Sequence, residues 1–359
     1  MRIGVLGAGG DMGRRVATDL LESGVEVVAA DLEPTALDGL GETERVVFDV
    51  TDYAAADRLE SLELDGVVSA VGPFYRFGER TLELAIEAGV PYVDLCDDHD
   101  ATATQLGHDE EASQAGVPAV VGCGWTPGIT NVLARREAEG LDGPVDVYID
   151  WIGSADDAEG HAVLLHVLHV TAGAVPQYRN GRVRDEPAGS DPFTLYVPEI
   201  GRARTRVCGH PEPVTLPDHL DAETVVLRGG LVDEWQNRLL GLVARAGPHP
   251  DSRKERVAGL VQALEGIAPS GGVERSAAVV TVEGTDGKRT VAAVGRMADL
   301  TGCAASVGIQ QLVGGHADPG VHPPEAVYEP NTFLGAVADR PIRFYRWHDG
   351  RWETDHGGP

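Results

Sequence analysis

The first residues that suggest a chemical role are glycines at the end of a short apolar run. Residues 2–6 lead directly into Gly7-Ala8-Gly9-Gly10-Asp11-Met12-Gly13, and apolar residues then recur with helical spacing. Phosphate binds to the backbone N–H groups of a helix N-terminus, and glycines allow its close approach. The spacing fits both G-x-G-x-x-x-G and G-x-x-G-x-x-G. We expect this turn to bind the diphosphate of a dinucleotide.

A carboxylate follows the next apolar run, where a ribose-binding residue belongs in such a unit. Residues 25–30 are mostly apolar and end at Asp31. A carboxylate can accept hydrogen bonds from the adenosine ribose of NAD, whereas the 2′-phosphate of NADP would bring like charge against it. We therefore expect NAD rather than NADP. Arg14 and Arg15 are the counter-argument, because either could pair with a phosphate, and Asp31 could also be an ordinary loop residue.

The charge balance excludes two classes of partner. The formal net charge is −28, and Lys254 and Lys288 are the two lysines. This excess of acid repels nucleic acid and anionic membranes, so we expect neither as a partner. It is also typical of proteins that stay soluble in a salt-rich cytosol, which favours a halophilic source.

Two further features of composition concern location and metal sites. No apolar run is long enough to span a bilayer, and the chain begins with a strand pattern, so we expect a soluble cytoplasmic protein. The four cysteines are scattered without a C-x-x-C pair, which argues against a disulfide framework or a structural zinc site. They are Cys96, Cys123, Cys208 and Cys303.

The first third of the chain alternates between strand and helix patterns. Such alternation is typical of a parallel sheet with helices on both faces, and ligands bind beyond the carboxyl ends of its strands. We expect the loops at Gly7, Asp31, Asp49, Gly72 and 96–99 to line one crevice. The predicted strands are 46–50, 66–71, 92–95 and 118–122, and the predicted helices are 53–62 and 79–88.

The pattern changes after Thr126-Pro127-Gly128. Residues 145–151 alternate between apolar and polar side chains, which predicts a half-exposed antiparallel strand. Thr285-Asp286-Gly287 lies between two apolar runs, 277–282 and 289–294, and predicts a hairpin. With predicted helices at 234–246 and 253–267, this region has the pattern of a second, α+β domain. A last helix, 303–313, is expected to pack against the first domain.

Several segments together resemble the saccharopine dehydrogenase-like family, in particular its saccharopine reductase and lysine dehydrogenase branches. They span most of the chain in the family's order. The matching segments are Val5-Leu6-Gly7-Ala8-Gly9-Gly10, Val71-Gly72-Pro73-Phe74, Ala88-Gly89-Val90-Pro91-Tyr92-Val93-Asp94, Gly122-Cys123-Gly124-Trp125-Thr126-Pro127-Gly128-Ile129 and 320–325.

The resemblance implies an α/β fold, a Rossmann-type doubly wound parallel sheet with a second α+β domain inserted before a C-terminal return. We place the dinucleotide-binding domain at 1–125 plus 303–350 and the substrate and dimerisation domain at 126–302. The resemblance also implies a homodimer.

The resemblance assigns Gly72 and Pro73 to the loop beside the nicotinamide and Asp49 and Val50 to the segment near the adenine. With these, the expected cofactor-binding residues are Gly7, Gly9, Gly10, Met12, Gly13, Asp31, Asp49, Val50, Gly72 and Pro73.

The expected catalytic residues are Asp97 and Cys123. In reductase relatives, an acidic residue after the fifth strand and a cysteine before the P-G turn lie near the substrate, and these map onto Asp97 and Cys123. Asp97, Asp98 and His99 follow a strand, where a titratable group can exchange a proton with an amine. Solvated loop acids are the alternative for these positions, and a buried apolar packing role is the alternative for Cys123.

Two sets of basic residues in the second domain have a competing structural explanation. His161, His166 and His169 lack the spacing and the glutamate of a zincin helix, so we expect packed or pocket-lining histidines and no metal site. Arg202, Arg204 and Arg206 alternate, so in a strand they share one face and could grip a carboxylate, or form a solvent-facing row. Residues 209–216 are expected to form a rigid connecting segment, and no chemical role is assigned to them.

These observations predict an NAD(P)-dependent oxidoreductase that transfers hydride at a C–N bond of an amino-acid-like, carboxylate-bearing small molecule. One alternative is reduction of a C=C or C=O bond in a lipid-like substrate. A non-catalytic NAD-binding sensor or scaffold is the other, because fold alone does not establish activity. We expect the substrate side of the cleft to draw on both domains.

Overall fold

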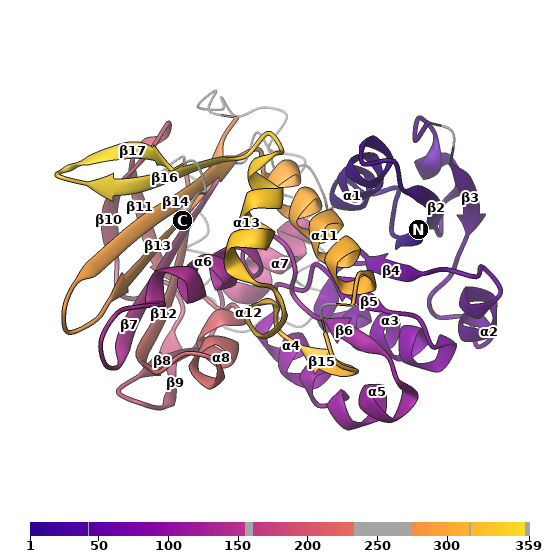
Figure 1. Ribbon diagram of the computed structural model, residues 1–359, viewed down its shortest axis with the longest axis horizontal. Coiled ribbons are helices and arrows are strands. Elements are labelled where there is room, and N and C mark those ends of the chain that lie inside the picture. The colour runs from indigo at the N-terminus through magenta and orange to yellow at the C-terminus, as the bar shows by residue number, and fades with distance from the viewer. Residues whose placement is uncertain (42, 155–160, 233–273, 316, 356–359) are drawn as a thin grey trace. The chain divides into compact units, whose positions relative to one another are not determined.

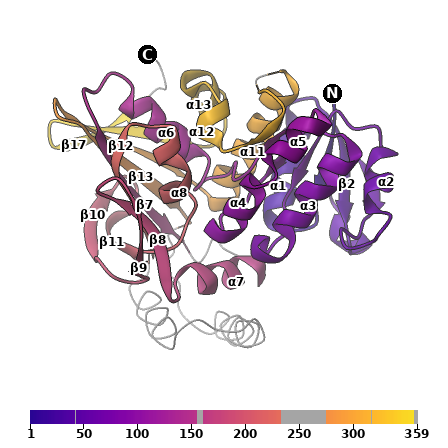
Figure 2. The same ribbon diagram turned by 90° about the horizontal axis from the view of Figure 1, so that it is seen from below.

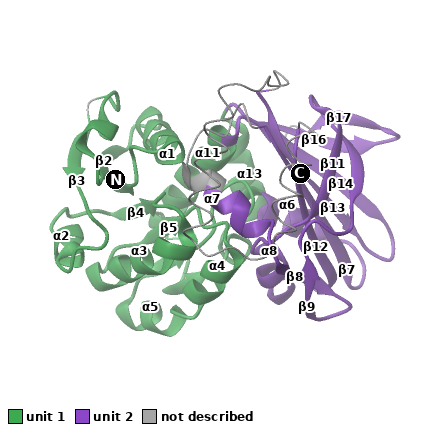
Figure 3. Cartoon of the chain, turned by 180° about the vertical axis from the view of Figure 1, so that it is seen from behind, with its two compact units in different colours: residues 1–129, 298–340 green, residues 130–297, 341–359 purple. Residues whose placement is uncertain are grey.

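The computed structural model describes the chain except residues 42, 155–160, 233–273, 316 and 356–359 (Figure 1). The chain divides into two units (Figure 3), residues 1–129 with 298–340 and residues 130–297 with 341–359. The predicted helices 234–246 and 253–267 lie outside the described residues. None of the described helices combines the length and the apolar character that crossing a membrane requires.

A seven-stranded sheet forms the core of the first unit. Its strand order is β15-β6-β5-β4-β1-β2-β3, and each neighbouring pair is parallel, as expected for a doubly wound Rossmann-type fold. Except for the mostly exposed edge strand β3, the strands are buried because helices cover both faces of the sheet, which explains their apolar sequences. The strands are β1 (Arg2–Leu6), β2 (Glu26–Asp31), β3 (Glu44–Val47), β4 (Gly66–Ser69), β5 (Tyr92–Asp94), β6 (Pro118–Val120) and β15 (Gly320–His322).

Helices connect these strands. Helix α3 packs against both α4 and α5, and Figure 2 shows the three together in the first unit. The described helical elements of the first unit are α1 (Asp11–Glu22), η1 (Pro34–Leu37), α2 (Ala55–Glu60), α3 (Phe74–Ala88), α4 (His99–Leu106), α5 (Asp109–Ala115), α11 (Met297–Val313), α12 (Pro324–Val327) and α13 (Pro330–Ala338).

The late segment 298–340 completes the first unit. Helix α11 packs on the sheet so closely that a Cβ on Gly66 would lie 2.8 Å from Val313 and 2.9 Å from Ile309. Arg15 of α1 holds the start of α11 through an ion pair to Asp299, with Nε 2.6 Å from Oδ1. The chain therefore returns to the sheet of its N-terminal segment after the second unit, and β15 joins that sheet beside β6.

Several predicted boundaries in the first unit were wrong, including the start of the last helix, which was predicted at Cys303 and lies at Met297. The predicted strand 46–50 is β3, which ends at Val47, because the Asp49 carboxylate instead accepts hydrogen bonds from the N–H and hydroxyl of Thr51 and forms a turn. The predicted helix 79–88 begins earlier, at Phe74. Its first turn is stabilised by Asp98, whose Oδ2 accepts a hydrogen bond from the Tyr75 N–H at 2.9 Å.

A fully buried carboxylate, Asp94, joins the ends of β5 and β6. Its Oδ1 accepts hydrogen bonds from the N–H groups of Cys96 (3.0 Å) and Gly122 (2.7 Å). Its Oδ2 accepts from the Tyr92 hydroxyl and the Gln105 amide. Burial raises the pKa of Asp94, and these four donors act against the rise. Asp94 thus fixes the two loops that follow these strands.

The second unit contains a ten-stranded mixed sheet. Eight strands follow the order β10-β11-β12-β7-β13-β14-β16-β17, and β8 pairs with β12 and β9. Strands β13 and β14 form the predicted hairpin. The strands are β7 (Val145–Gly153), β8 (Ala174–Arg179), β9 (Val183–Pro187), β10 (Phe193–Val197), β11 (Gly201–Val207), β12 (Ala222–Leu231), β13 (Ser276–Glu283), β14 (Lys288–Gly295), β16 (Arg343–His348) and β17 (Arg351–Asp355).

Strand β7 lies inside this sheet and differs in two respects from the predicted half-exposed antiparallel strand. Seven of its nine residues are buried and none is exposed. It pairs antiparallel with β13, as predicted, but parallel with β12 on its other side. The helical elements of this unit are α6 (Ile129–Ala138), α7 (His161–Val170), α8 (Glu212–Thr215) and η3 (Leu216–Asp218).

The C-terminal segment of the described chain belongs to the second sheet. The predicted return extended to residue 350, whereas β16 pairs with β14 and β17 extends the same sheet. A partly buried ionic network explains the difference. Both terminal guanidinium nitrogens of Arg346 contact the Glu137 carboxylate of α6, at 2.7 and 2.8 Å, and Arg136 contacts Asp355 at 2.9 Å.

We predict that Asp94→Ala lowers the free energy of unfolding by at least about 2 kcal/mol, because it leaves the buried N–H groups of Cys96 and Gly122 without their acceptor. Chemical denaturation measures the loss. Asp94→Asn should restore part of it, since an amide oxygen can face both N–H groups. The exposed Asp57→Ala is the matched control, with a change within about 0.5 kcal/mol. Equal losses for Asp94→Ala and Asp57→Ala would contradict this role.

Candidate functional site

The turn between β1 and α1 is pinned to the neighbouring strand. Gly7 has a φ of +78°, a conformation that glycine adopts readily. The N–H groups of Gly7 and Ala8 both donate to the carbonyl oxygen of Ala30, at 2.8 and 3.1 Å. A Cβ on Gly7 would lie 2.9 Å from the carbonyl oxygen of Ala70, on β4's side of β1. The turn is therefore fixed against both strands that flank β1.

Steric contacts decide between the two glycine patterns that the sequence left open. A Cβ on Gly13 would lie 2.1 Å from the Gly7 oxygen, and one on Gly9 would lie 2.4 Å from the Ala36 Cβ. A Cβ on Gly10 would meet its nearest neighbour at 3.6 Å, an ordinary contact. The required set is therefore Gly7, Gly9 and Gly13, the G-x-G-x-x-x-G pattern.

Helix α1 begins at this turn without a side-chain cap. Gly10 is the N-cap residue, and the Gly10 carbonyl accepts the first helical hydrogen bond, from Arg14 N–H, at 2.8 Å. The N-terminal end of a helix carries a partial positive charge and favours an anion. Met12 lies in the first turn and is half-buried. The turn has the geometry of a phosphate-binding helix start.

The Asp31 carboxylate lies beside the glycine turn. Its Oδ2 accepts a hydrogen bond from the Gly9 N–H at 2.9 Å, and its Oδ1 accepts from the Glu33 N–H at 3.2 Å. The side chain is half-buried at the end of β2. Asp31 is thus held at the edge of the sheet next to the glycines.

The two arginines that follow the glycine turn have partners in the first unit. The Arg15 guanidinium contacts Asp299, Asp19 and the Cys303 sulfur. The Arg14 guanidinium donates to the carbonyl oxygens of Ala36 and Asp38, in the segment that follows Asp31. Arg15 is directed at α11, so Arg14 is the arginine that lies nearer to the Asp31 segment.

The two residues predicted near the adenine, Asp49 and Val50, follow β3. Asp49 is exposed, and hydrogen bonds from Thr51 lower the pKa of its carboxyl. Val50 is buried in the core of the first unit. The Phe48 N–H donates to the Asp31 carbonyl at 2.8 Å, which keeps this segment beside the end of β2.

The two residues predicted beside the nicotinamide, Gly72 and Pro73, follow β4. Their peptide bond is cis, and Pro73 is the N-cap residue of α3. The carboxyl ends of parallel strands lie at one edge of a sheet. The glycine turn, Asp31, Asp49, Gly72 and the 96–99 loop follow β1, β2, β3, β4 and β5 in turn, so the structure brings these predicted segments to one edge.

The acidic residues after β5 have different surroundings. Asp98 is fully buried and accepts a hydrogen bond from the first turn of α3, so it has a structural role. Asp97 and His99 are half-buried. Of the three, Asp97 is the carboxylate with solvent access, and its catalytic role stays a prediction.

The Cys123 thiol is fully buried against α11. Its Sγ lies 3.6 Å from the Ala304 carbonyl oxygen and would be 2.5 Å from a Cβ on Gly308. Burial raises the pKa of this thiol to about 12, although a hydrogen bond with Tyr328 acts in the opposite direction. A thiol in such surroundings is neutral at physiological pH and packs as a small apolar group, which favours the structural alternative.

In the second unit, the structure reveals a buried polar cluster that the sequence did not predict. The Glu212 carboxylate is fully buried, accepts a hydrogen bond from the Thr130 hydroxyl at 2.8 Å and lies 3.8 Å from His210 Nδ1. The ring of His166 contacts that of His210, with centroids 5.3 Å apart. Residues 209–216 therefore carry buried titratable groups, although their spacing matches no motif.

The other basic candidates of the second unit are less enclosed. His169 is half-buried, and the side chain of His161 lies outside the described residues. On β11, Arg202 and Arg204 are exposed and Arg206 is half-buried, which favours a solvent-facing row. Among the described residues of this unit, Arg228 is the buried arginine, and its Nε lies 2.9 Å from Asp150 Oδ1. No sequence pattern predicted this ion pair, because its partners are far apart in the chain.

Comparison with known proteins agrees with this geometry. Residues 3–120 match the family described as saccharopine dehydrogenase NADP binding domain. Through residues 3–120, the chain is similar to the saccharopine dehydrogenase-like family. The match covers β1 through β6, including the glycine turn and Asp31. The first unit therefore contains an NAD(P)-binding domain of a kind found in oxidoreductases.

Solved structures extend the likeness in fold to nearly the whole chain. Saccharopine dehydrogenase (L-Glu forming) from Saccharomyces cerevisiae is 14% identical, with a TM-score of 0.63 over 97% of this chain and 100% of that chain. Homospermidine synthase from Legionella pneumophila, solved in complex with NAD, is 11% identical, with a TM-score of 0.64 over 98% of this chain and 92% of that chain. At these identities, the likeness shows a shared fold.

We predict that Gly13→Ala destabilises the protein by about 1–3 kcal/mol, because its Cβ overlaps the Gly7 oxygen. Gly335→Ala is the matched control. Gly335 also lies in a helix, α13, but a Cβ there meets nothing within 4 Å, so alanine should stabilise the protein by up to about 1 kcal/mol. Thermal unfolding of both variants measures the contrast. Two changes of the same sign would contradict the close packing at Gly13.

Proposed function

We propose that the protein is an NAD-dependent oxidoreductase that transfers hydride at a C–N bond of an amino-acid-like, carboxylate-bearing substrate. The observation that carries the proposal is the glycine turn with Asp31 beside it. A Cβ on Gly13 would intrude on the backbone of Gly7, and one on Gly9 would intrude on the side chains of Ala36 and Asp31. Helix α1 begins at this turn without a side-chain cap. These are the features that a dinucleotide diphosphate requires.

The bound nicotinamide would supply the hydride acceptor or donor, and the protein would supply binding and orientation. The N-terminus of α1 would hold the diphosphate, and Asp31 would hold the ribose of the adenosine. The segments at Asp49 and Gly72 are the proposed neighbours of the adenine and the nicotinamide. Asp97 is the proposed proton acceptor for the amine, because its carboxylate is half-buried whereas the Cys123 thiol is enclosed.

The preference for NAD over NADP rests on the charge at Asp31. The name of the matched family includes NADP, so the two cofactors are opposing expectations for this chain. Asp31 is fixed by the Gly9 N–H, and the exposed Glu33 lies two residues further along. A 2′-phosphate at this edge would meet both carboxylates, whereas two ribose hydroxyls would donate to Asp31. Arg14 is the residue that favours NADP.

We predict that the wild type binds NADH more tightly than NADPH and that Asp31→Ser changes the ratio of the two dissociation constants at least about tenfold towards NADPH, or about 1.4 kcal/mol. Titration of cofactor fluorescence measures both ligands on both proteins. The exposed Glu110→Gln on α5, which packs at the β15–β6 end of the sheet, serves as the control for a general change in charge. Tighter NADPH binding by the wild type, or an unchanged ratio in Asp31→Ser, would show that Asp31 does not select the cofactor.

The catalytic part of the proposal needs a substrate screen. Amino acids and their adducts with keto acids are incubated with NAD or NADH, and absorbance reports the redox state of the cofactor. We predict that Asp97→Asn lowers kcat on the active substrate at least about 100-fold, as expected for loss of general acid–base catalysis. Its cofactor affinity should stay unchanged, and the exposed Asp100→Asn should keep its activity. Cofactor binding with no turnover of any compound would favour a sensor or scaffold.

A further inference from the structure

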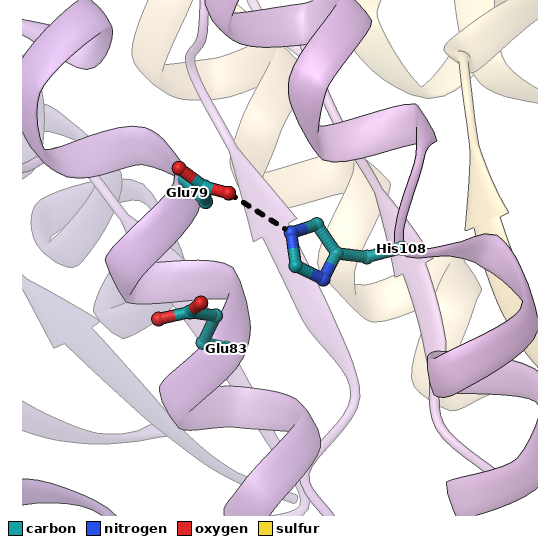
Figure 4. A group of neighbouring side chains, drawn as sticks. All are labelled: Glu79, Glu83 and His108. Carbon is teal, nitrogen blue, oxygen red and sulfur yellow. Dashed lines mark hydrogen bonds and ion pairs between the residues drawn. The ribbon is translucent and has the colours of Figure 1, made fainter.

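A histidine and two glutamates come together on the first unit, away from the glycine turn. Glu79 and Glu83 lie four residues apart on α3, so they occupy adjacent turns of one helix face. His108 is the N-cap residue of α5, which packs against α3. Figure 4 shows its imidazole ring directed at α3, with Glu79 opposite one ring nitrogen and Glu83 one turn along the helix.

We propose that Glu79, Glu83 and His108 form a binding site for a divalent transition-metal ion such as Zn²⁺. Each residue offers one ligand atom, and these atoms all lie within 4.8 Å of one another. His108 Nε2 is 3.2 Å from Glu79 Oε1. Zinc binds imidazole nitrogen and carboxylate oxygen at about 2.0–2.2 Å, which holds its ligand atoms about 3–4 Å apart. Closure on the ion therefore needs only side-chain rotation.

The ligand residues can make that rotation. The Glu79 side chain is 53% exposed and that of Glu83 34%, so neither is fixed by packing. The His108 side chain is the most rigid of the three because it is only 19% exposed. The site therefore has one rigid nitrogen ligand and two adjustable oxygen ligands, with open positions for water.

A fourth side chain orients the histidine. His108 Nδ1 lies 2.9 Å from Glu111 Oε2, in the first turn of α5. Histidines that bind metals commonly donate the other ring N–H to a carboxylate, which fixes the tautomer and directs the free nitrogen at the ion. With Nδ1 held by Glu111, Nε2 is the nitrogen that faces Glu79. This arrangement distinguishes the group from an ordinary set of surface acids.

Charge and ligand type define the ion. Three carboxylates surround the imidazole, and the nearby cation is Arg80, whose Nη1 lies 3.4 Å from Glu83 Oε2 and 3.5 Å from Glu87 Oε1. Because Arg80 has a second partner in Glu87, Glu83 can turn to an ion. Magnesium, calcium and manganese prefer oxygen ligands, whereas imidazole nitrogen suits zinc, copper, iron and nickel. We therefore expect Zn²⁺ to bind far more tightly than Mg²⁺.

Isothermal titration of the EDTA-treated full chain with ZnCl₂ tests the proposal. We expect one site in the wild type, and a loss of affinity of at least tenfold in His108→Ala and in the double variant Glu79→Gln/Glu83→Gln. The exposed Glu110→Gln on α5 is the matched control and should keep the wild-type affinity, because Glu110 contacts Gln114 and not the three ligands. The cysteines are buried, so they do not offer a competing site in the folded protein.

Circular dichroism verifies that each variant is folded, and Glu111→Gln provides a second measurement. It keeps all three ligands but replaces the carboxylate that orients His108, so affinity should fall by less than in His108→Ala. No zinc binding by the wild type would overturn the proposal, as would equal affinity in the wild type and both ligand variants. Equal zinc and magnesium affinity would also overturn it. Cofactor binding at the glycine turn is independent of these outcomes.

Discussion

The close packing of backbone at the β1–α1 turn constrains the rest of the proposed cofactor site. Gly13 approaches the Gly7 oxygen so closely that a Cβ would lie 2.1 Å from it, and the same turn hydrogen-bonds to β2 through Ala30. This packing brings the N-terminus of α1 to the edge of the sheet. It also sets the Gly9 N–H against the Asp31 carboxylate. An anion-binding helix end and a fixed carboxylate are therefore positioned by one local structure.

The remaining loops at this edge are held by polar contacts between segments distant in sequence. Asp94 accepts the N–H groups that open the loops after β5 and β6, and Asp98 stabilises the start of α3. Both carboxylates are fully buried and hydrogen-bonded, so they fix geometry. Asp97 lies between these two acids in the sequence and is only half-buried. These three acids lie within five residues of one another in the chain. Burial therefore decides which of them have a structural role and which one is available for chemistry.

The sequence predicted what depends on local pattern and periodicity. The parallel sheet, its glycine turn and the carboxylate after β2 were predictable because apolar runs, glycine spacing and Asp31 lie within one continuous segment. The hairpin 277–294 was predictable because its turn residues adjoin both strands. The start of α3 was not, because Asp98 supplies its stabilising contact from 23 residues away.

Residue pairs that come together only in the tertiary structure could not be predicted from the sequence. Glu79 and His108 are 29 residues apart, and their spacing matches no metal motif. The ion pairs of Arg346 with Glu137 and of Arg136 with Asp355 join segments more than 200 residues apart, so the sequence could not assign 341–350 to the second sheet. The sequence likewise assigned no chemistry to the segment with His210 and Glu212. The tertiary structure places these residues in a buried cluster, where Glu212 accepts a hydrogen bond from Thr130.

A crystal structure of the full chain with NADH would test the central claim most directly. The account predicts the diphosphate against the backbone N–H groups at the start of α1, and the hydroxyls of the adenosine ribose within hydrogen-bond distance of Asp31. A dinucleotide bound elsewhere, or one whose adenosine ribose lies away from the end of β2, would contradict it.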